Sequence, residues 1–486
     1  MEHVNWIVTS LIFFADLTLR IGLSIRVIMR KRAASVSLAW LVVILMLPLA
    51  GAIIYLLFGE NRLGENRAKR AAANLQFLTQ WSTKLKNPQN VDWEKINPEC
   101  VPVSRQISAY FNIPALQGNN LQLLAHSDLF FAELLKDISR ATSFCYLQFY
   151  ILESGGATDD VITSVIDAAR RGVTCRIMLD SIGSRQFLKS KTPAKLRAAG
   201  VEVIEVLPAG LFRYLFVRVD LRNHRKIVLI DSKIAYTGSQ NLVDPHFFKQ
   251  NSGVGQWKDS MVRIQGPIIE VMLAAFLYDW TLETGASIDT LLEKDLFVTP
   301  KTTGDAVVQI VPSGPGFRDD AIHDLLLTTI YAAREELILT TPYFVPDNAI
   351  LSALKSAAGR GVAVTIVVPE KNDSKLVHYA SQSMFDELVE AGVRIMFFSK
   401  GLLHSKTITV DNDFCLFGSV NLDMRSFWLN FEMTLFIYNK SFTGKLRKLQ
   451  TEYISDSTPM DYTVYRNRSF GQRLKENVAL LVGPLL

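Results

Sequence analysis

Two segments of the chain carry the same polar residues at the same spacing. In each copy, a histidine and a lysine stand two residues apart on an apolar, strand-forming run, so both side chains point to the same side of the strand. A Gly-Ser-x-Asn turn follows, and its hydroxyl, amide and backbone groups can surround anionic oxygens. The repeated residues are His224, Lys226, Asp231, Gly238, Ser239 and Asn241 in the first copy and His404, Lys406, Asp411, Gly418, Ser419 and Asn421 in the second.

Brought together, the two copies supply the groups that a displacement at a phosphodiester needs without a metal. One imidazole attacks phosphorus, the other protonates the leaving oxygen, and the lysines and asparagines neutralise the phosphoryl charge. A structural histidine would not explain the repeated lysine, serine and asparagine. The remaining histidines have no motif and no metal-ligand spacing, so we expect structural or incidental roles for them and no metal or other cofactor. They are His3, His126, His246, His323 and His378.

The duplication extends beyond the polar residues. Residues 168–173 (Ala-Ala-Arg-Arg-Gly-Val) resemble residues 357–362 (Ala-Ala-Gly-Arg-Gly-Val), and short β-rich runs follow both. Each copy alternates helical patterns with buried strand patterns, which is typical of an α/β fold. The sequence therefore predicts two duplicated α/β lobes, each a mixed sheet flanked by helices, within one enzyme.

The N-terminal region predicts a transmembrane helical hairpin. Residues 33–59 contain no charged residue and are long enough to cross a bilayer, with Pro48 expected to kink the helix. Residues 4–25 are apolar except for Asp16 and Arg20, which can pair at i, i+4 spacing. The alternatives are an interfacial or re-entrant helix for the first segment and a buried core helix for the second. Basic residues flank the second span equally, so the positive-inside rule leaves both orientations open.

Composition limits the other functions. The 486 residues have a net charge of +5, which excludes a dedicated DNA-packaging protein, and 49% of them are hydrophobic. The four cysteines have no zinc-site spacing. We interpret Cys145, Cys175 and Cys415 as buried core thiols.

Both copies match every position of the signature HxKxxxxDxxxxxxGSxN, and on these residues the chain resembles the phospholipase D superfamily over residues 110–460. The resemblance implies phospholipase D-like lobes. It also implies that His224 is the nucleophile that forms a phosphohistidine, and that His404 is the general acid and then the base. The substrate phosphate would be bound by the two lysines, Lys226 and Lys406, and by the serines and asparagines of the turns, Ser239, Asn241, Ser419 and Asn421.

Four acidic residues accompany the motifs. The signature places Asp231 and Asp411 among the catalytic residues, but each lies at an odd offset from its histidine and should leave the catalytic face of a regular strand. We interpret them as structural or orienting groups. The resemblance implies a further acidic residue that orients each histidine, and Asp259 and Glu432 are the candidates.

Further segments are similar to bacterial cardiolipin synthases: the N-terminal spans, residues 253–259, 341–346 and 421–426. The resemblance implies that two phosphatidylglycerols give cardiolipin and glycerol. It implies a multi-pass protein of the bacterial inner (cytoplasmic) membrane with phosphatidylglycerol and anionic membrane lipid as partners and no nucleic acid. The acceptor stays open between phosphatidylglycerol, phosphatidylethanolamine and water, so the alternatives are a phospholipase D hydrolase, another headgroup-exchanging phosphatidyltransferase and a non-enzymatic lipid scaffold.

These features predict five parts. They are a membrane anchor (1–60), a linker (61–110), lobe 1 (111–300) with the first motif (219–246), lobe 2 (301–465) with the second (399–426), and a basic-apolar tail (466–486). Residues 211–218 mix apolar and basic side chains, which fits insertion beside anionic headgroups as well as an ordinary strand or helix. The tail predicts either a surface-lying helix or a helix packed on lobe 2.

Overall fold

A computed structural model of the chain describes residues 2–30, 34–60, 67–74, 91–208, 218, 220–287, 291, 302–481 and 483. The chain divides into two compact units. Unit 1 comprises Met1–Ala68 with Ala209–Leu221, and unit 2 comprises Lys69–Pro208 with Arg222–Leu486.

The described residues of unit 1 up to position 60 form the helices α1 (Glu2–Met29), α2 (Ala34–Met46) and α3 (Ala50–Phe58). A small core of Leu23, Val27, Ile44, Ala52 and Tyr55 holds them together. Polar groups add to it: Arg20 forms an ion pair with Asp16, as their spacing predicted, and Glu60 accepts hydrogen bonds from Arg26, Arg30 and the Tyr55 hydroxyl.

The prediction of two transmembrane helices is not supported. The uncharged stretch 33–59 is not one helix, because proline at position 48 cannot continue the hydrogen-bond ladder and the chain turns at Leu49 (φ 53°) between α2 and α3. α1 is longer, but Asp16, Arg20 and Arg26 interrupt its apolar sequence. None of the helices in the described ranges is both long and apolar enough to cross a membrane.

Unit 2 is built on one sheet in which the sequence duplication becomes a structural one. From one edge the strands run β20-β14-β13-β11-β16-β17-β19-β10-β1-β9-β7-β6-β2-β3-β4. The lobe 1 strands are β1 (Leu116–Leu124), β2 (Phe144–Phe149), β3 (Thr174–Asp180), β4 (Glu202–Val206), β6 (Ile227–Ile230), β7 (Ile234–Gly238) and β9 (Met261–Gln265). Their lobe 2 counterparts are β10 (Ala306–Ser313), β11 (Glu336–Thr340), β13 (Ala363–Pro369), β14 (Arg394–Phe398), β16 (Thr407–Val410), β17 (Phe414–Gly418) and β19 (Asn430–Tyr438), with β20 (Ser457–Pro459) added at the edge.

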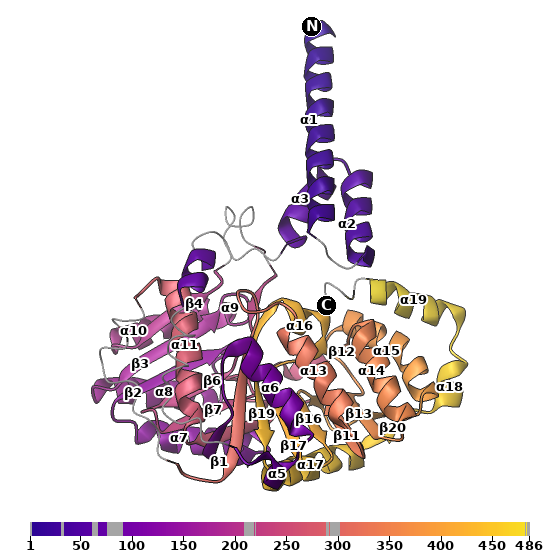
Figure 1. The fold of residues 1–486 in the computed structure, drawn as a ribbon. Coiled ribbons are helices and arrows are strands. Elements are labelled where there is room, and N and C mark those ends of the chain that lie inside the picture. The colour runs from indigo at the N-terminus through magenta and orange to yellow at the C-terminus, as the bar shows by residue number, and fades with distance from the viewer. Residues whose placement is uncertain are drawn as a thin grey trace. The chain divides into compact units, whose positions relative to one another are not determined.

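The strand order is the same in both lobes when each is read outward from the centre. β1 and β10 pair antiparallel there and join the two half-sheets. Each half contains three parallel strands, β2–β3–β4 or β11–β13–β14, and the motif hairpin, β6–β7 or β16–β17, pairs antiparallel beside them. In lobe 2 the additional edge strand β20 pairs antiparallel with β14. Two structurally equivalent lobes therefore share one continuous sheet (Figure 1).

Helices cover the sheet. Lobe 1 has α7 (Ser127–Ser139), α8 (Ala157–Arg170), α9 (Arg185–Lys189), α10 (Thr192–Ala198), the 3-10 helix Gln250–Ser252 and α11 (Ile268–Thr284). Lobe 2 has α13 (Ala321–Ala332), α14 (Asn348–Gly359), α15 (Lys375–Glu390), α16 (Met424–Trp428), α17 (Lys440–Ser455), α18 (Tyr462–Arg466) and α19 (Phe470–Leu481). Here α8 packs on β3, as α14 packs on β13, so the helical layers repeat as well.

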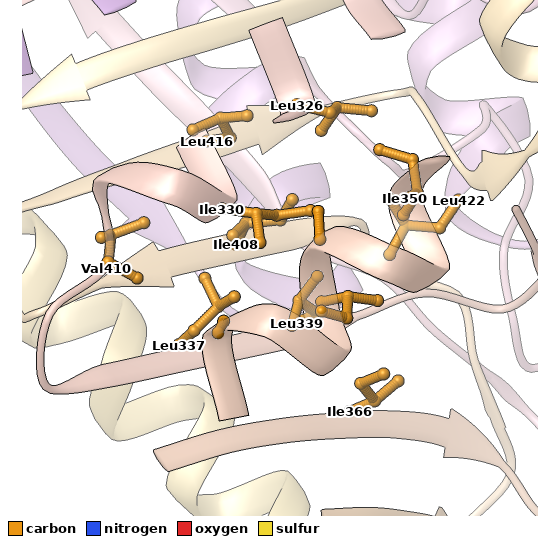
Figure 2. Packing of buried hydrophobic residues seen from close by; sticks show 14 of the residues in the cluster. Leu326, Ile330, Leu337, Leu339, Ile350, Ile366, Ile408, Val410, Leu416 and Leu422 are labelled. Atoms are coloured by element: carbon orange, nitrogen blue, oxygen red, sulfur yellow. The ribbon is translucent and has the colours of Figure 1, made fainter. Parts of the chain in front are cut away.

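The lobe 2 core shows why these residues form strands and helices. Apolar side chains two residues apart, such as Leu337 and Leu339 on β11 or Ile408 and Val410 on β16, point to one face of the sheet. Leu326 and Ile330 of α13 pack against them at i, i+4 spacing. Figure 2 shows this packing, in which all the labelled side chains are buried.

Part of the predicted linker is a folded part of lobe 2. Residues 67–74 are helical, and α5 (Trp93–Ile96) and α6 (Cys100–Phe111) follow in the next described range. Cys100, Val103 and Ile107 are buried in the lobe 2 core. The prediction of a linker over residues 61–110 is therefore wrong for residues 100–110, which belong to α6. The apolar positions of this helix form one face among polar neighbours.

Candidate active site

The two histidines and two lysines of the repeated motif are buried in unit 2. His224 is 8% exposed and His404 2%, while Lys226 and Lys406 are 0% and 4% exposed. The ammonium of Lys226 donates to the backbone carbonyl of His224 (2.6 Å), and Lys406 does the same to His404 (2.5 Å). Because each lysine has two more N–H donors, it can also bind an anion.

Short strands carry each histidine to the opposite lobe. β5 (Arg222–Asn223) pairs in parallel with β19 of lobe 2, and β15 (Leu402–Leu403) pairs in parallel with β8 (Trp257–Lys258) of lobe 1. The pairing continues into the motif, where His224 N–H donates to Phe431 O (2.9 Å) and His404 N–H to Lys258 O (2.8 Å). Each histidine is thus placed beside the residue that follows on the other lobe, Glu432 or Asp259.

The two acidic candidates contact the histidines across the lobes. His224 Nδ1 lies 2.9 Å from Glu432 Oε2, and His404 Nδ1 lies 2.7 Å from Asp259 Oδ1. A carboxylate only accepts, so each Nδ1 carries the proton and each Nε2 keeps its lone pair in the neutral ring. The structure brings Asp259 and Glu432 to the place that the resemblance implied for orienting residues, but each serves the histidine of the other repeat.

The serines of the Gly-Ser-x-Asn turns bind protein groups in the structure. Ser419 Oγ donates to Glu432 Oε2 (2.5 Å) and accepts from Met433 N–H (3.0 Å). Ser239 Oγ accepts from Ser260 N–H (3.1 Å), next to Asp259. In the structure these hydroxyls hold the acid-bearing strands, and their binding of a substrate phosphate stays a prediction.

The asparagines of the same turns each leave one amide atom without a hydrogen bond. Asn241 Oδ1 accepts from Ile151 N–H (3.1 Å), while its buried Nδ2 has no partner in the described part of the chain. In Asn421 the Nδ2 contacts Ser426 Oγ (3.2 Å) and Oδ1 has no partner there. A half-turn of the Asn421 amide exchanges N and O and gives the Asn241 pattern, with an unused donor for an anionic oxygen.

Asp231 and Asp411 lie away from this cluster, at the far ends of β6 and β16. Asp231 accepts from the backbone N–H groups of three successive residues, 142–144, and Asp411 from those of residues 334–336. Both have positive φ (53° and 50°), as tight turns require. The structure does not bring these two aspartates to the histidines and lysines of the motifs. This agrees with the expectation that a residue at an odd offset from its histidine leaves that face of the strand, and not with the inclusion of both aspartates among the catalytic residues.

Sequence reasoning missed three further groups at the site. The Tyr150 ring lies 5.1 Å from the His224 ring, and the Trp257 ring lies 4.4 Å from the His404 ring. Arg225 lies between His224 and Lys226, in the segment that joins β5 to β6. It forms an ion pair with Asp279 (2.5 Å) and donates to Glu432 O (3.0 Å). Only the alternation of strand side chains distinguished Arg225 from the catalytic residues in the sequence.

Burial sets the protonation of the site. Burial and the nearby lysine charges lower the pKa of both histidines, against the opposing effect of Glu432 and Asp259. Burial also lowers the pKa of Lys226 to about 7 and of Lys406 to about 8. For Glu432 and Asp259, burial would raise the pKa, but the paired histidine and the lysines outweigh it and lower the pKa of both carboxyls.

The site can therefore bind one anion between two neutral imidazoles. An entering phosphodiester brings a negative charge, which raises the pKa of the lysines and of the histidines. One histidine can then act as a nucleophile through Nε2 while the other carries a proton. The basic-apolar segment 211–218, which we expected beside the motif, lies outside the described residues except for Arg218.

Comparisons with known proteins identify the family. The family model described as "Cardiolipin synthase, PLD-like domain" matches residues 134–280 and 326–452, and "Phospholipase_D-nuclease N-terminal" matches residues 19–60. The chain is 44% identical to cardiolipin synthase A of Serratia proteamaculans over 99% of both chains. It is 45% identical to that of Yersinia pseudotuberculosis over 96% of both.

A solved structure has the same fold. The phosphatidylserine synthase of Haemophilus influenzae Rd KW20 superposes with a TM-score of 0.61 at 15% identity, covering 79% of this chain and 100% of that one. The match to both lobes and the identity over nearly the full length show that the chain belongs to the cardiolipin synthase family of phospholipase D-like proteins.

Proposed function

We propose that the chain is a cardiolipin synthase, a phosphatidyltransferase that joins two phosphatidylglycerols to give cardiolipin and glycerol. The observation that carries the proposal is the pair of buried histidines, each held through Nδ1 by a carboxylate, with two lysines beside them. Near-full-length identity to cardiolipin synthase A proteins supports the choice of substrate.

In the first half-reaction, His224 Nε2 attacks phosphorus of one phosphatidylglycerol. The bond from phosphorus to the oxygen of the headgroup glycerol breaks, and His404 gives its proton to that oxygen. The second phosphatidylglycerol then attacks with its headgroup hydroxyl, His404 takes the hydroxyl proton, and the phosphorus–nitrogen bond breaks. Lys226, Lys406, Asn241 and Asn421 hold the phosphoryl oxygens, and each lobe (111–300 and 301–465) supplies one histidine.

The test is conversion of labelled phosphatidylglycerol, supplied alone, by the purified protein. Cardiolipin and glycerol are the expected products, and His224→Ala should give neither. Phosphatidic acid without cardiolipin would assign the protein to the hydrolases, and turnover only with another acceptor would assign it to the other headgroup exchangers.

Glu432→Gln tests the orienting role of this carboxylate. Glutamine keeps the shape but removes the charge that positions His224, so we expect kcat to fall by about 10²–10⁴-fold with little change in KM. Glu336→Gln is the matched control, because Glu336 of β11 forms a partly exposed ion pair with Arg447 of α17, and such pairs contribute little to stability. If the two substitutions change kcat equally, Glu432 does not orient His224 for catalysis.

The pH dependence follows from the lysines. Both are charged below their pKa values of about 7 and about 8 and lose charge as the pH rises through them. Since the charged form binds the anionic substrate, kcat/KM, which reports the free enzyme, should fall on the alkaline side between about pH 7 and pH 9. A profile that stays flat across this interval would contradict the phosphate-binding role.

We also propose that unit 1 associates with the bacterial inner (cytoplasmic) membrane, where the lipid substrate lies. α1 exposes many apolar side chains, among them Trp6 (73%), Leu11 (64%) and Phe14 (62%). A large exposed apolar surface of this kind marks an interaction site. The double substitution Leu11→Gln, Phe14→Gln should shift the full-length protein from the pelleted membrane fraction toward the supernatant, and an unchanged distribution would reject the proposal.

A further inference from the structure

The C-terminal helix α19 presents a narrow apolar stripe to the outside of unit 2. Its four exposed apolar side chains are Phe470 (76%), Leu474 (51%), Val478 (54%) and Leu481 (80%). With 3.6 residues per turn, their positions fall within an arc of about 80°. The stripe is thus one continuous face and not a scatter of single exposed residues.

The opposite face of α19 fixes the helix on the enzyme. α19 packs along α15 (Figure 1), and Ala479 is buried in the lobe 2 core. Glu476, the acidic residue of the helix, is 1% exposed and binds Arg468 (2.8 Å). Of the two alternatives that the sequence left for the tail, the structure has the packed helix, and it leaves the stripe outward.

The exposed charges of α19 are basic. Arg473 and Lys475 are exposed, and helical geometry places them about 60° beyond the two margins of the stripe. Long basic side chains beside an apolar face can reach phosphate headgroups while the apolar residues enter the acyl boundary. An anionic lipid surface therefore matches both the apolar stripe and its margins.

The helix also ends close to the second motif of lobe 2. Just beyond α19 lies Gly483, where a Cβ, if present, would stand 3.5 Å from Val345 of β12 (Phe344–Val345) and 3.9 Å from Met424 of α16. β12 pairs with β18 (Leu422–Asp423), which directly follows Asn421. A lipid surface bound to α19 would consequently lie on the side of lobe 2 that carries β12, β18 and the adjoining Asn421.

We propose that α19 is an interfacial helix that binds the surface of an anionic phospholipid bilayer and holds the catalytic unit against it. The inference deepens the proposed function, because it says how the site would reach a substrate that stays in the bilayer. It is independent of the chemistry, because lipid contact of α19 requires no turnover.

The experiment uses the full-length protein on vesicles and measures the lipid contact of α19 by itself. Leu474→Cys is labelled with an environment-sensitive fluorophore, with the exposed Thr451→Cys of α17 as matched control, since the four natural cysteines are buried. Vesicles contain phosphatidylglycerol and brominated phosphatidylcholine. We expect the probe at position 474 to be quenched at least about twofold and the probe at position 451 to be unchanged.

Two further measurements define the outcome. Arg473→Gln with Lys475→Gln, or vesicles without phosphatidylglycerol, should reduce the quenching at position 474. Equal signals at positions 474 and 451 on vesicle-bound protein would overturn the proposal and leave the stripe to another occupant, such as a second copy of the chain. Cardiolipin formation, measured on the same samples, separates this failure from a failure of the proposed function.

Discussion

His224→Ala is expected to reduce the rate of phosphatidyl transfer by at least about 10⁵-fold, because removal of a covalent nucleophile leaves only binding and charge stabilisation. His404→Ala should cost less, about 10²–10⁴-fold, which is the usual contribution of a general acid. Both rates are measured as release of labelled glycerol from phosphatidylglycerol.

A substrate with an activated leaving group separates the two roles. A phosphatidyl ester of p-nitrophenol needs no protonation of its leaving oxygen, so His404→Ala should regain most of the first half-reaction and accumulate the phosphohistidine. His224→Ala should regain nothing. Recovery by His224→Ala in place of His404→Ala would exchange the roles of the two histidines.

Arg225→Met is expected to cause the largest loss of stability. Arg225 is 0% exposed and Asp279 2%, and the substitution leaves the Asp279 carboxylate buried without its cation. Breaking such a pair costs about 3–5 kcal/mol. The midpoint of denaturant unfolding, followed by tryptophan fluorescence, should fall accordingly.

Two further variants test whether the buried charge of Asp279 causes this loss of stability. Arg225→Met with Asp279→Leu removes both charges and should recover a large part of the loss, since apolar replacement of a buried pair is often tolerated. Arg170→Met breaks the exposed pair with Asp167 and should change stability by less than about 1 kcal/mol. If the double variant is no more stable than Arg225→Met, the buried charge is not the cause.

The sequence predicts the repeated parts of this protein well. Both α/β lobes follow from local periodicity and from duplicated residues, and so does the common facing of His224 and Lys226. Asp259 and Glu432 could be proposed as orienting groups from the resemblance. Their exchange between the lobes could not, because it depends on β5 pairing with β19 and β8 with β15, and the pairing of strands far apart in sequence leaves no local pattern.

Other details depend on tertiary contacts in the same way. The Gly-Ser-x-Asn pattern suggests a phosphate cup, but whether Ser419 faces a phosphate or Glu432 is decided by the strand that packs beside it. The apolar face of α6 is short and lies among polar residues, so the sequence alone predicts a linker there. The structure shows that this face packs into the core of lobe 2. In unit 1, the length of the uncharged stretch suggested one span, and Pro48 with the turn at Leu49 divides it.

The exchange of acidic partners makes each histidine depend on a chain segment from the other lobe. If the lobes were separate proteins, each imidazole would be oriented only when two molecules associate. The associated fraction would fall as the protein is diluted. Joined in one chain, the lobes meet at an effective concentration set by their connection, in the millimolar range for short linkers. Carrying both lobes in one chain thus makes the assembly of the site independent of how much of the protein a cell contains.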